Sequence, residues 1–413
     1  LTLNARTDGS SKFNSNERWG FFPGAAFAWR INQENFLKNS NTFSDLKLRI
    51  GYGITGQQSG IAYFGYLPRY TVSDSSNLYQ MGSTYYNMFR PEAYDPNLRW
   101  ETTKNLNIGI DFGLFKGRLN GTIDLFDRKT EDLLSTVPVP LGTNFAPQLL
   151  TNVGNLTNRG IEIGLNATPI QRKGFVWELA TNFSYIVPEI DKLLFNEDPA
   201  FKGVQVGGIS GGTGNTIQIH SVGNNPAAFY VLQQIYDKAG KPIEGLYEDR
   251  NRDGIINDND RYIYKRPDPL YLLGISSNLT YDKWSAAFTA RGSFDNYVYN
   301  NISSNMGVLR NIINPIGIIN NGHRDYFATG FKNNQYFSDY YVQNASFFRM
   351  ENINIGYNAG EVFKGSTLRL GASVQNAFVI TKYKGIDPEI NGGIDNTFYP
   401  RPRTYTLSVN LDF

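Results

Sequence analysis

The sequence has no cysteine among its 413 residues, so disulfides, thiolate metal sites and cysteine nucleophiles are excluded. Only two histidines occur, His220 and His323, and neither lies in an HExxH metal motif. A phosphate-binding Gly-Lys-Ser/Thr loop is also missing. These absences predict a protein that is not an enzyme.

Charged residues and long apolar runs are scarce too. Charged side chains make up 18% of the chain and the formal net charge is +2, so no nucleic-acid partner is expected. No run of about 18 apolar residues exists, so no membrane helix is predicted. Aromatic residues are abundant instead, with 26 Tyr and 28 Phe beside 41 Gly. This composition suits amphipathic strands, which need one apolar face and about 9–11 residues to cross a bilayer.

Apolar and polar side chains alternate in several segments. Every second residue along 175–185 is apolar or aromatic except Thr181, and the residues between them are more polar. Residues 161–168 and 404–413 repeat this pattern. A period of two predicts strands with one buried face and excludes a helix. A sandwich and a membrane barrel both bury one face, so alternation alone leaves both folds open.

The spacing of the strands favours the barrel. Twelve strands are predicted, near residues 1–7, 19–30, 44–55, 102–113, 116–130, 158–169, 174–186, 270–281, 283–296, 346–357, 366–378 and 403–413. Between them, tight turns at 115–117, 171–174, 281–283 and 360–365 alternate with long loops at 56–101, 131–157, 187–269, 297–345 and 379–402. Outer-membrane barrels alternate in this way, with short periplasmic turns and long extracellular loops. The connection near 31–45 is an exception, because it is long yet expected on the periplasmic side.

Two local features refine this prediction. The alternation slips between Met350 and Ile353, where we expect a β-bulge. Four tryptophans fall near predicted strand ends, where they suit either an aromatic girdle or ordinary sheet packing: Trp29, Trp100, Trp177 and Trp284.

Residues 152–163 read Asn-Val-Gly-Asn-Leu-Thr-Asn-Arg-Gly-Ile-Glu-Ile, which resembles the N-x-G-x-x-x-N-R-G-x-E signature of TonB-dependent receptors. Further segments resemble the SusC/RagA-like branch of that family, at 8–13, 19–23, 28–30, 97–105 and 398–403. The resemblance runs in order along nearly the whole chain. It implies import of oligosaccharides or peptides across the bacterial outer membrane, driven by TonB and aided by a SusD-like surface lipoprotein.

The resemblance also implies a larger barrel. Transporters of this type close at about 22 strands around a plugged lumen, more than the twelve predicted here. The family's plug and TonB box lie upstream of the barrel, and nothing in this sequence matches them. We therefore expect residues 1–413 to form the C-terminal part of an all-β, antiparallel transmembrane β-barrel in outer-membrane lipid. TonB would act through the absent N-terminal region.

One motif in the long loop 187–269 predicts a cation site. Residues 249–260 match the spacing of an EF-hand calcium loop, with Gly254 at the sharp turn. Six residues supply candidate oxygen ligands: Asp249, Asn251, Asp253, Ile255 through its carbonyl, Asn257 and Asp260. Asp260 stands where glutamate is usual and no amphipathic helices flank the loop, so an Asx-rich turn without an ion is the alternative. No other cofactor is expected.

Loop tyrosines are the candidate contacts for a polar ligand, because sugar faces stack on aromatic rings. The candidates are Tyr63, Tyr66, Tyr85, Tyr297 and Tyr340, with Tyr299 and Tyr341 among further tyrosines of the same loops. Loop acids such as Asp387 and Glu389 are expected to be solvated.

Two alternatives to the active transporter stay open on the sequence. In the first, the twelve strands close on themselves as a passive porin or translocator barrel. In the second, the chain is a soluble secreted β-protein that binds calcium and carbohydrate.

Overall fold

The computed structural model describes residues 1–74, 76–139, 148–194, 199–212, 214–313, 317, 319–396 and 399–413. Phe398, which belongs to one of the motifs above, lies outside these residues, as do 140–147 and 195–198 of two predicted loops. No helix within the described ranges is long and apolar enough to span a membrane.

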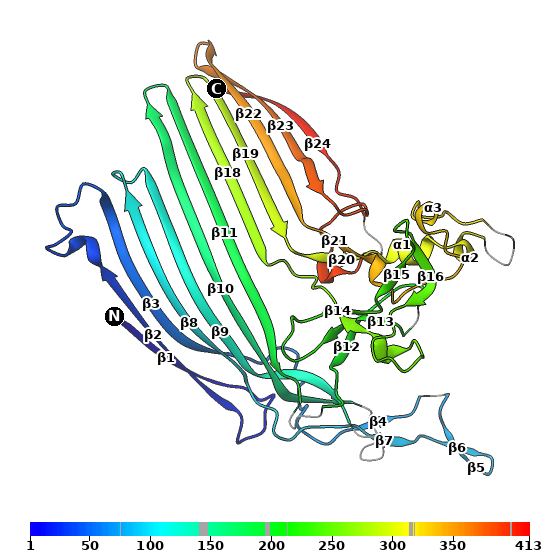
Figure 1. The fold of residues 1–413 in the computed structure, drawn as a ribbon. Coiled ribbons are helices and arrows are strands. Elements are labelled where there is room, and N and C mark those ends of the chain that lie inside the picture. The colour runs from blue at the N-terminus through cyan, green and yellow to red at the C-terminus, as the bar shows by residue number, and fades with distance from the viewer. Residues whose placement is uncertain are drawn as a thin grey trace.

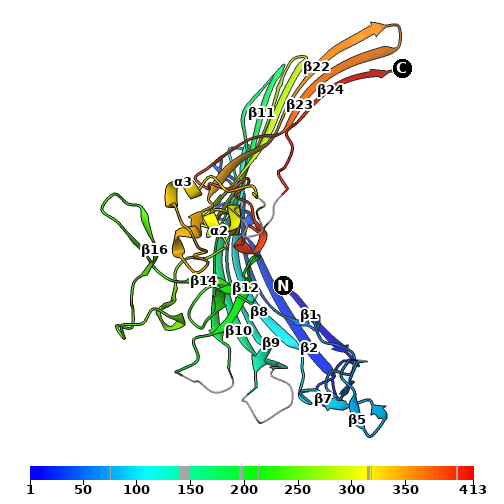
Figure 2. The same cartoon turned by 90° about the vertical axis from the view of Figure 1, so that its right-hand side faces the viewer.

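Twelve long strands form one antiparallel sheet in which spatial order follows chain order. They are β1 (Thr2–Gly9), β2 (Trp19–Arg30), β3 (Phe43–Gln57), β8 (Glu101–Leu114), β9 (Leu119–Pro138), β10 (Gln148–Arg172), β11 (Phe175–Lys192), β18 (Tyr271–Tyr281), β19 (Trp284–Phe294), β22 (Phe347–Phe363), β23 (Ser366–Thr381) and β24 (Thr404–Asp412). Figures 1 and 2 show a curved wall with β1 at one edge and β24 at the other. The all-β antiparallel prediction is confirmed. Within the described residues the wall does not close on itself, which argues against a self-contained twelve-stranded barrel.

One end of the wall carries the tight connections. Residues 173–174 and 282–283 are two-residue hairpins, and Gly174 and Asp282 both adopt positive φ, at 76° and 47°. Such left-handed residues match the twist of a two-residue hairpin. The two turns also meet, since the Asp282 amide donates to the Gly174 carbonyl at 2.7 Å. The longer connection from β2 to β3 begins with a 3-10 turn, Ile31–Gln33.

The predicted loop 131–157 is largely strand, and that expectation was wrong. β9 continues to Pro138 and β10 begins at Gln148, with pairs such as Ser135 to Thr151. The extension was missed because apolar residues are adjacent there, at 133–134 and 149–150, instead of alternating with polar ones, so the period-two signal is lost. The predicted bulge is confirmed, because the register of β22 skips Glu351 against both neighbouring strands.

The register assembles the alternating apolar residues into rows on one face, called here the outward face. One row crosses eight strands through Phe27, Ile50, Ile108, Leu125, Ile161, Tyr185, Tyr271 and Phe294. Leu125 is 53% exposed in the chain, and each Å² of such surface costs about 25 cal/mol in water. An outward face of this kind suits lipid.

Three of the four tryptophans lie on the outward face near the tight turns, as an aromatic girdle requires: Trp29, Trp177 and Trp284. Trp100 does not, because it is buried beside Phe13, with ring centroids 5.2 Å apart.

The opposite end of the wall carries the long loops. Three of them, 193–270, 295–346 and 382–403, fold together into a unit called here the cap (Figure 1). Its elements are β12 (Val204–Gly208), β13 (Thr216–His220), β14 (Ala228–Val231), β15 (Gln234–Tyr236), β16 (Pro242–Tyr247), β17 (Tyr262–Ile263), β20 (Tyr297–Tyr299), β21 (Val342–Asn344), α1 (Asn301–Met306), α2 (Leu309–Ile312), α3 (Tyr326–Thr329) and the 3-10 turns Asp258–Asp260, Asp339–Tyr341 and Asn391–Gly393. The loop between β3 and β8 forms two nested strand pairs, β4 (Tyr70–Val72) with β7 (Phe89–Pro91) and, in the chain between them, the hairpin of β5 (Tyr79–Met81) and β6 (Thr84–Tyr86).

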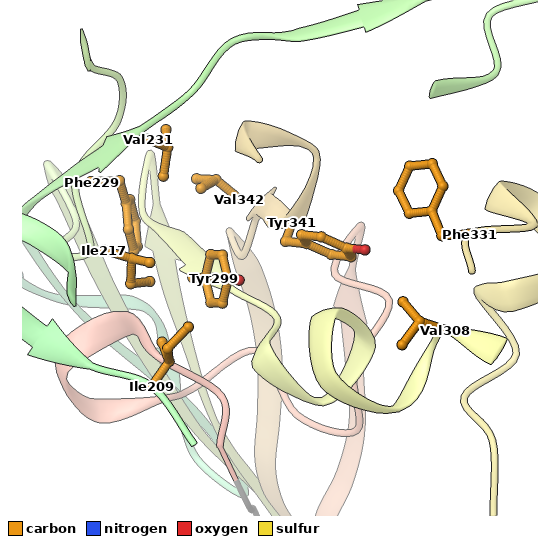
Figure 3. Close-up of a cluster of buried hydrophobic side chains, with 9 residues drawn as sticks. All are labelled: Ile209, Ile217, Phe229, Val231, Tyr299, Val308, Phe331, Tyr341 and Val342. Carbon is orange, nitrogen blue, oxygen red and sulfur yellow. The ribbon is translucent and has the colours of Figure 1, made fainter. Parts of the chain in front are cut away.

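A buried apolar cluster holds the cap together. It consists of Ile209, Ile217, Phe229, Val231, Tyr299, Val308, Phe331, Tyr341 and Val342, with Ile394 packed against it. Figure 3 shows these side chains gathered between the cap's strands and helices, with Val308 and Phe331 at one end. The cluster draws on two of the loops, 193–270 and 295–346, and the third packs against it through Ile394, so the cap is a packed structure with its own core.

Candidate functional site

The face opposite the outward face, called here the luminal face, carries buried and half-buried charges. Arg49 of β3 pairs with Asp111 of β8 at 2.7 Å and with Asp124 of β9 at 2.9 Å. Gly109 makes this possible, because a Cβ there would lie only 2.3 Å from an Asp124 oxygen and 2.7 Å from an Arg49 nitrogen. Charges on a barrel wall are tolerated toward water and penalised toward lipid. The luminal face therefore suits a water-filled interior.

Further along the luminal face, two arginines stand directly opposite each other. Arg291 of β19 is the cross-strand partner of Arg349 of β22. Like charges in this position destabilise a sheet unless they are neutralised. Part of the neutralisation comes from Glu351, the bulged residue of β22, whose carboxylate pairs with Arg291. The rest comes from the cap.

The cap segment 382–403 returns to the wall and supplies two carboxylates. Asp387 pairs with Arg349 at 2.7 and 2.8 Å, and only 1% of the Arg349 side chain and 6% of the Asp387 side chain remain exposed. Glu389 bridges Arg291 and Arg401, the latter at 2.8 Å. The expectation that these loop acids are solvated was wrong. Asp387 is buried and Glu389 is half-buried, with 32% of its side chain exposed, because each is held by arginine.

These contacts set the protonation of Glu389. Burial alone would raise the pKa of Glu389, but the hydrogen bonds from Arg291 and the charges of Arg401 and Arg349 hold it below its usual range. Glu389 is therefore a carboxylate, and it fastens the segment 382–403 to β19.

A second set of buried polar groups ties this segment to the rest of the cap. The Tyr383 hydroxyl donates to Asp395 at 2.6 Å, and Asp395 is 1% exposed. Burial raises the pKa of Asp395. The Asp395 amide also donates to the carbonyl of Tyr299, a member of the buried cluster.

The candidate tyrosines fall into separate groups. Tyr63 and Tyr85 are 70% and 59% exposed in the loop between β3 and β8, and Tyr66 of that loop is half-buried. Tyr297 and Tyr340 pack against the cap cluster, and the Tyr340 hydroxyl donates to Asp325 at 2.9 Å. The structure thus does not gather the five rings at one place.

Tyr299 and Tyr341 were wrong as candidates for ligand contact. They are 0% and 1% exposed, because both rings belong to the cap cluster. Sequence composition does not separate such core tyrosines from surface ones.

The segment 249–260 forms a tight turn closed by its own side chains. Asp249 accepts from the Gly254 amide at 2.8 Å, and Gly254 has the left-handed φ of 82° that the turn requires. Asp260 is fully buried and accepts from the amides of Arg250 and Asn257 at 3.0 and 2.8 Å. The Asn257 amide, followed by those of Asn251 and Arg250, lowers the pKa of Asp260.

The segment 249–260 shows no cluster of acidic side chains of the kind that usually binds a metal ion. Across the described part of the chain, no three His, Asp or Glu side chains converge to hold a metal ion. Three of the six proposed ligands, Asn251, Asn257 and the Ile255 carbonyl, are uncharged oxygen ligands. The prediction of a cation site therefore rests on the spacing of the ligands and on the geometry of the turn.

Comparison with known proteins places this architecture in a family. Residues 1–377 match the family described as "TonB dependent receptor-like, beta-barrel". The chain belongs to this family. Members are outer-membrane β-barrels, so the wall of this TonB-dependent receptor barrel lies in the outer membrane, which excludes the soluble secreted alternative.

The relatives of this TonB-dependent receptor barrel include SusC- and RagA-type proteins. It is 44% identical over 421 residues to the TonB-dependent receptor SusC of Bacteroides thetaiotaomicron, covering 100% of this chain and 42% of that protein. It is 30% identical over 451 residues to TonB-dependent receptor P3 of Formosa agariphila, covering 100% of this chain and 44% of that protein. The structure of the RagAB peptide transporter matches with a TM-score of 0.78 at 26% identity, covering 100% of this chain and 45% of that one. The chain thus spans less than half the length of these relatives.

Proposed function

We propose that the protein imports oligosaccharides or peptides across the outer membrane, energised by TonB and assisted by a SusD-like surface lipoprotein. The observation that carries this proposal is the pairing of an apolar outward face with a charged, ion-paired luminal face along one wall. Such a wall separates lipid from a polar passage. The likeness to SusC, a TonB-dependent receptor by name, and to the RagAB peptide transporter supports the same function.

The polar character of the passage and the cap supports this cargo class. The luminal face presents carboxylates and guanidinium groups, and the cap adds amides and tyrosine rings. Such groups bind hydroxyl- and amide-bearing molecules. Tyr63, Tyr66, Tyr85, Tyr297 and Tyr340 stay the candidate contacts with cargo.

Uptake by whole cells tests the proposal. Deleting the gene is expected to abolish uptake of the imported oligosaccharide or peptide, and so is deleting TonB, because the passage opens only when energy is supplied. The measurement is accumulation of fluorescently labelled oligosaccharide and peptide panels, with re-expression of the gene as the control. Uptake that persists without TonB would favour a passive barrel instead.

Calcium in the segment 249–260 is the second part of the proposal. The spacing of its oxygen donors, and the left-handed turn at Gly254, support an ion that stiffens this extracellular loop. Asp249, Asn251, Asp253, the Ile255 carbonyl, Asn257 and Asp260 would hold it.

Chelation tests the ion. Removing calcium from the whole protein is expected to increase protease cutting between residues 240 and 265, because the loop loses the ligand that fixes it. Asp253→Ala should raise cutting in calcium and make it insensitive to chelator. Asn259→Ala, at a non-ligand position of the same loop, should behave like the unaltered protein. Equal cutting in all conditions would reject the ion.

A further inference from the structure

A second polar site lies in the cap, away from the luminal ion pairs. It is a cavity of about 650 Å³ beside α1 and α2. Its described lining consists of Gly211, Asn305, Met306, Arg310, Asn311, Asn320, Asn333, Asn334 and Tyr336. Five of these nine residues are asparagines, and Arg310 is the one charged member of this described set. None of the five tyrosines named above as candidate cargo contacts lines this cavity.

The floor of the cavity is fixed by hydrogen bonds. The side-chain amide of Asn311 donates to the backbone carbonyl of Asn305 at 2.6 Å. The side-chain amide of Asn334 donates to the backbone carbonyl of Ser304 at 3.1 Å. The Tyr336 hydroxyl donates to the Gly211 carbonyl at 2.8 Å, which joins the cap loop 295–346 to the cap loop 193–270. Tyr336 also packs against the buried cluster. The cavity is therefore formed before any ligand arrives, which reduces the entropic cost of binding.

The rim keeps unused hydrogen-bonding capacity. Arg310 is exposed, and its backbone amide donates to the Lys332 carbonyl at 3.0 Å. Its guanidinium has no ion pair or hydrogen bond within the described residues. The Asn320 side-chain nitrogen donates to the Asn311 backbone carbonyl at 3.1 Å, and its side-chain oxygen accepts no hydrogen bond within the described residues. Glu244 does not line the cavity and is already engaged by the amides of Lys332 and Asn333.

We infer that this cavity binds a sugar ring of an oligosaccharide, an inference that rests on the transport function proposed above. Within the described residues, the Asn305 side-chain nitrogen and the side-chain oxygens of Asn320 and Asn333 take part in no hydrogen bond, so they offer a donor and two acceptors to the hydroxyls of a sugar. The Tyr336 ring supplies an aromatic surface, and Arg310 supplies charge-assisted hydrogen bonds to a hydroxyl or a carboxylate. A peptide would need apolar pockets for its side chains, and Met306 is the sole aliphatic member of the described lining.

Binding to the whole purified protein tests this inference. The probe is an array of neutral and uronate-containing oligosaccharides from plant, microbial and host sources, with a peptide library of similar size beside it. Arg310→Gln and Asn320→Ala are each expected to weaken oligosaccharide binding by about tenfold, the loss of one to two hydrogen bonds. Lys332→Gln removes a neighbouring charge outside the cavity and should leave binding unchanged. Unchanged melting temperatures of the variants would show that the cap stays folded.

Two patterns of binding support the inference and three results overturn it. A uronate preference lost in Arg310→Gln assigns that side chain to a carboxylate, and an equal loss for neutral sugars assigns it to a hydroxyl. Oligosaccharide binding that neither variant weakens, or binding of peptides alone, overturns the site. Absence of binding in the array while cells still import labelled oligosaccharide also overturns it and leaves transport intact. If cells that carry the unaltered gene import neither labelled oligosaccharide nor labelled peptide, the proposed function itself fails.

Discussion

Replacing Arg349 with alanine is expected to lower the free energy of unfolding by about 3–5 kcal/mol, because the carboxylate of Asp387 is left buried without a cation. The Arg349 side chain is 1% exposed, and it also donates to Asn376 at 2.7 Å. Its loss therefore releases the cap segment 382–403 from β22 and removes a hydrogen bond between β22 and β23. Urea unfolding of the whole protein in lipid vesicles measures the change, and protease cutting within 382–403 reports the release.

An exposed ion pair of the same wall provides the matched control. Arg369 and Asp412 lie 3.3 Å apart with 62% and 60% of their side chains exposed. Arg369→Ala should leave the free energy of unfolding nearly unchanged, because exposed pairs contribute little. Adding Asp387→Ala to Arg349→Ala should recover part of the loss, since it removes the orphaned charge. A loss in Arg349→Ala no larger than in Arg369→Ala would contradict the anchoring role.

The long sheet was predictable because lipid and water impose opposite demands on its two faces. Residues 175–185 alternate so regularly that β11 was predicted within a residue of its observed start. The extracellular end of β10 lacks that signal. Thr151 and Asn152 are buried there by neighbouring loops, and Asn152 donates to the carbonyls of Arg99 and Asp132. These contacts between β10 and the neighbouring loops stabilise the end of the strand, and they become visible only in the folded protein.

The candidate site was less predictable, because its contacts join distant parts of the chain. Asp387 lies 38 positions from Arg349, and Glu389 lies 98 positions from Arg291. Sequence spacing carries no sign of either pairing. The calcium motif was visible because all its donors fall within twelve residues. The asparagine-lined cavity was not, since its lining comes from three separate stretches of the cap.

A charge on the outward face is expected to have the second large effect. Ile123 of β9 pairs with Ile110 and Ile163, which places it within the apolar rows. Ile123→Arg should make folding into the membrane less favourable by about 2–4 kcal/mol, the cost of arginine near the middle of a bilayer. The expected result is a lower yield of folded protein in vesicles and a lower urea midpoint. Folding can be followed by the heat-dependent shift in electrophoretic mobility that folded barrels show.

The neighbouring position gives a control that separates charge from crowding. Thr122 precedes Ile123 on the same strand but faces the lumen, where its cross-strand partner is Asp111. Because strand residues alternate between faces, Thr122→Arg places the same side chain in water beside a carboxylate. It should fold nearly as well as the unaltered protein. If both variants fold equally well, the outward face does not meet lipid, and the assignment of the two faces fails with it.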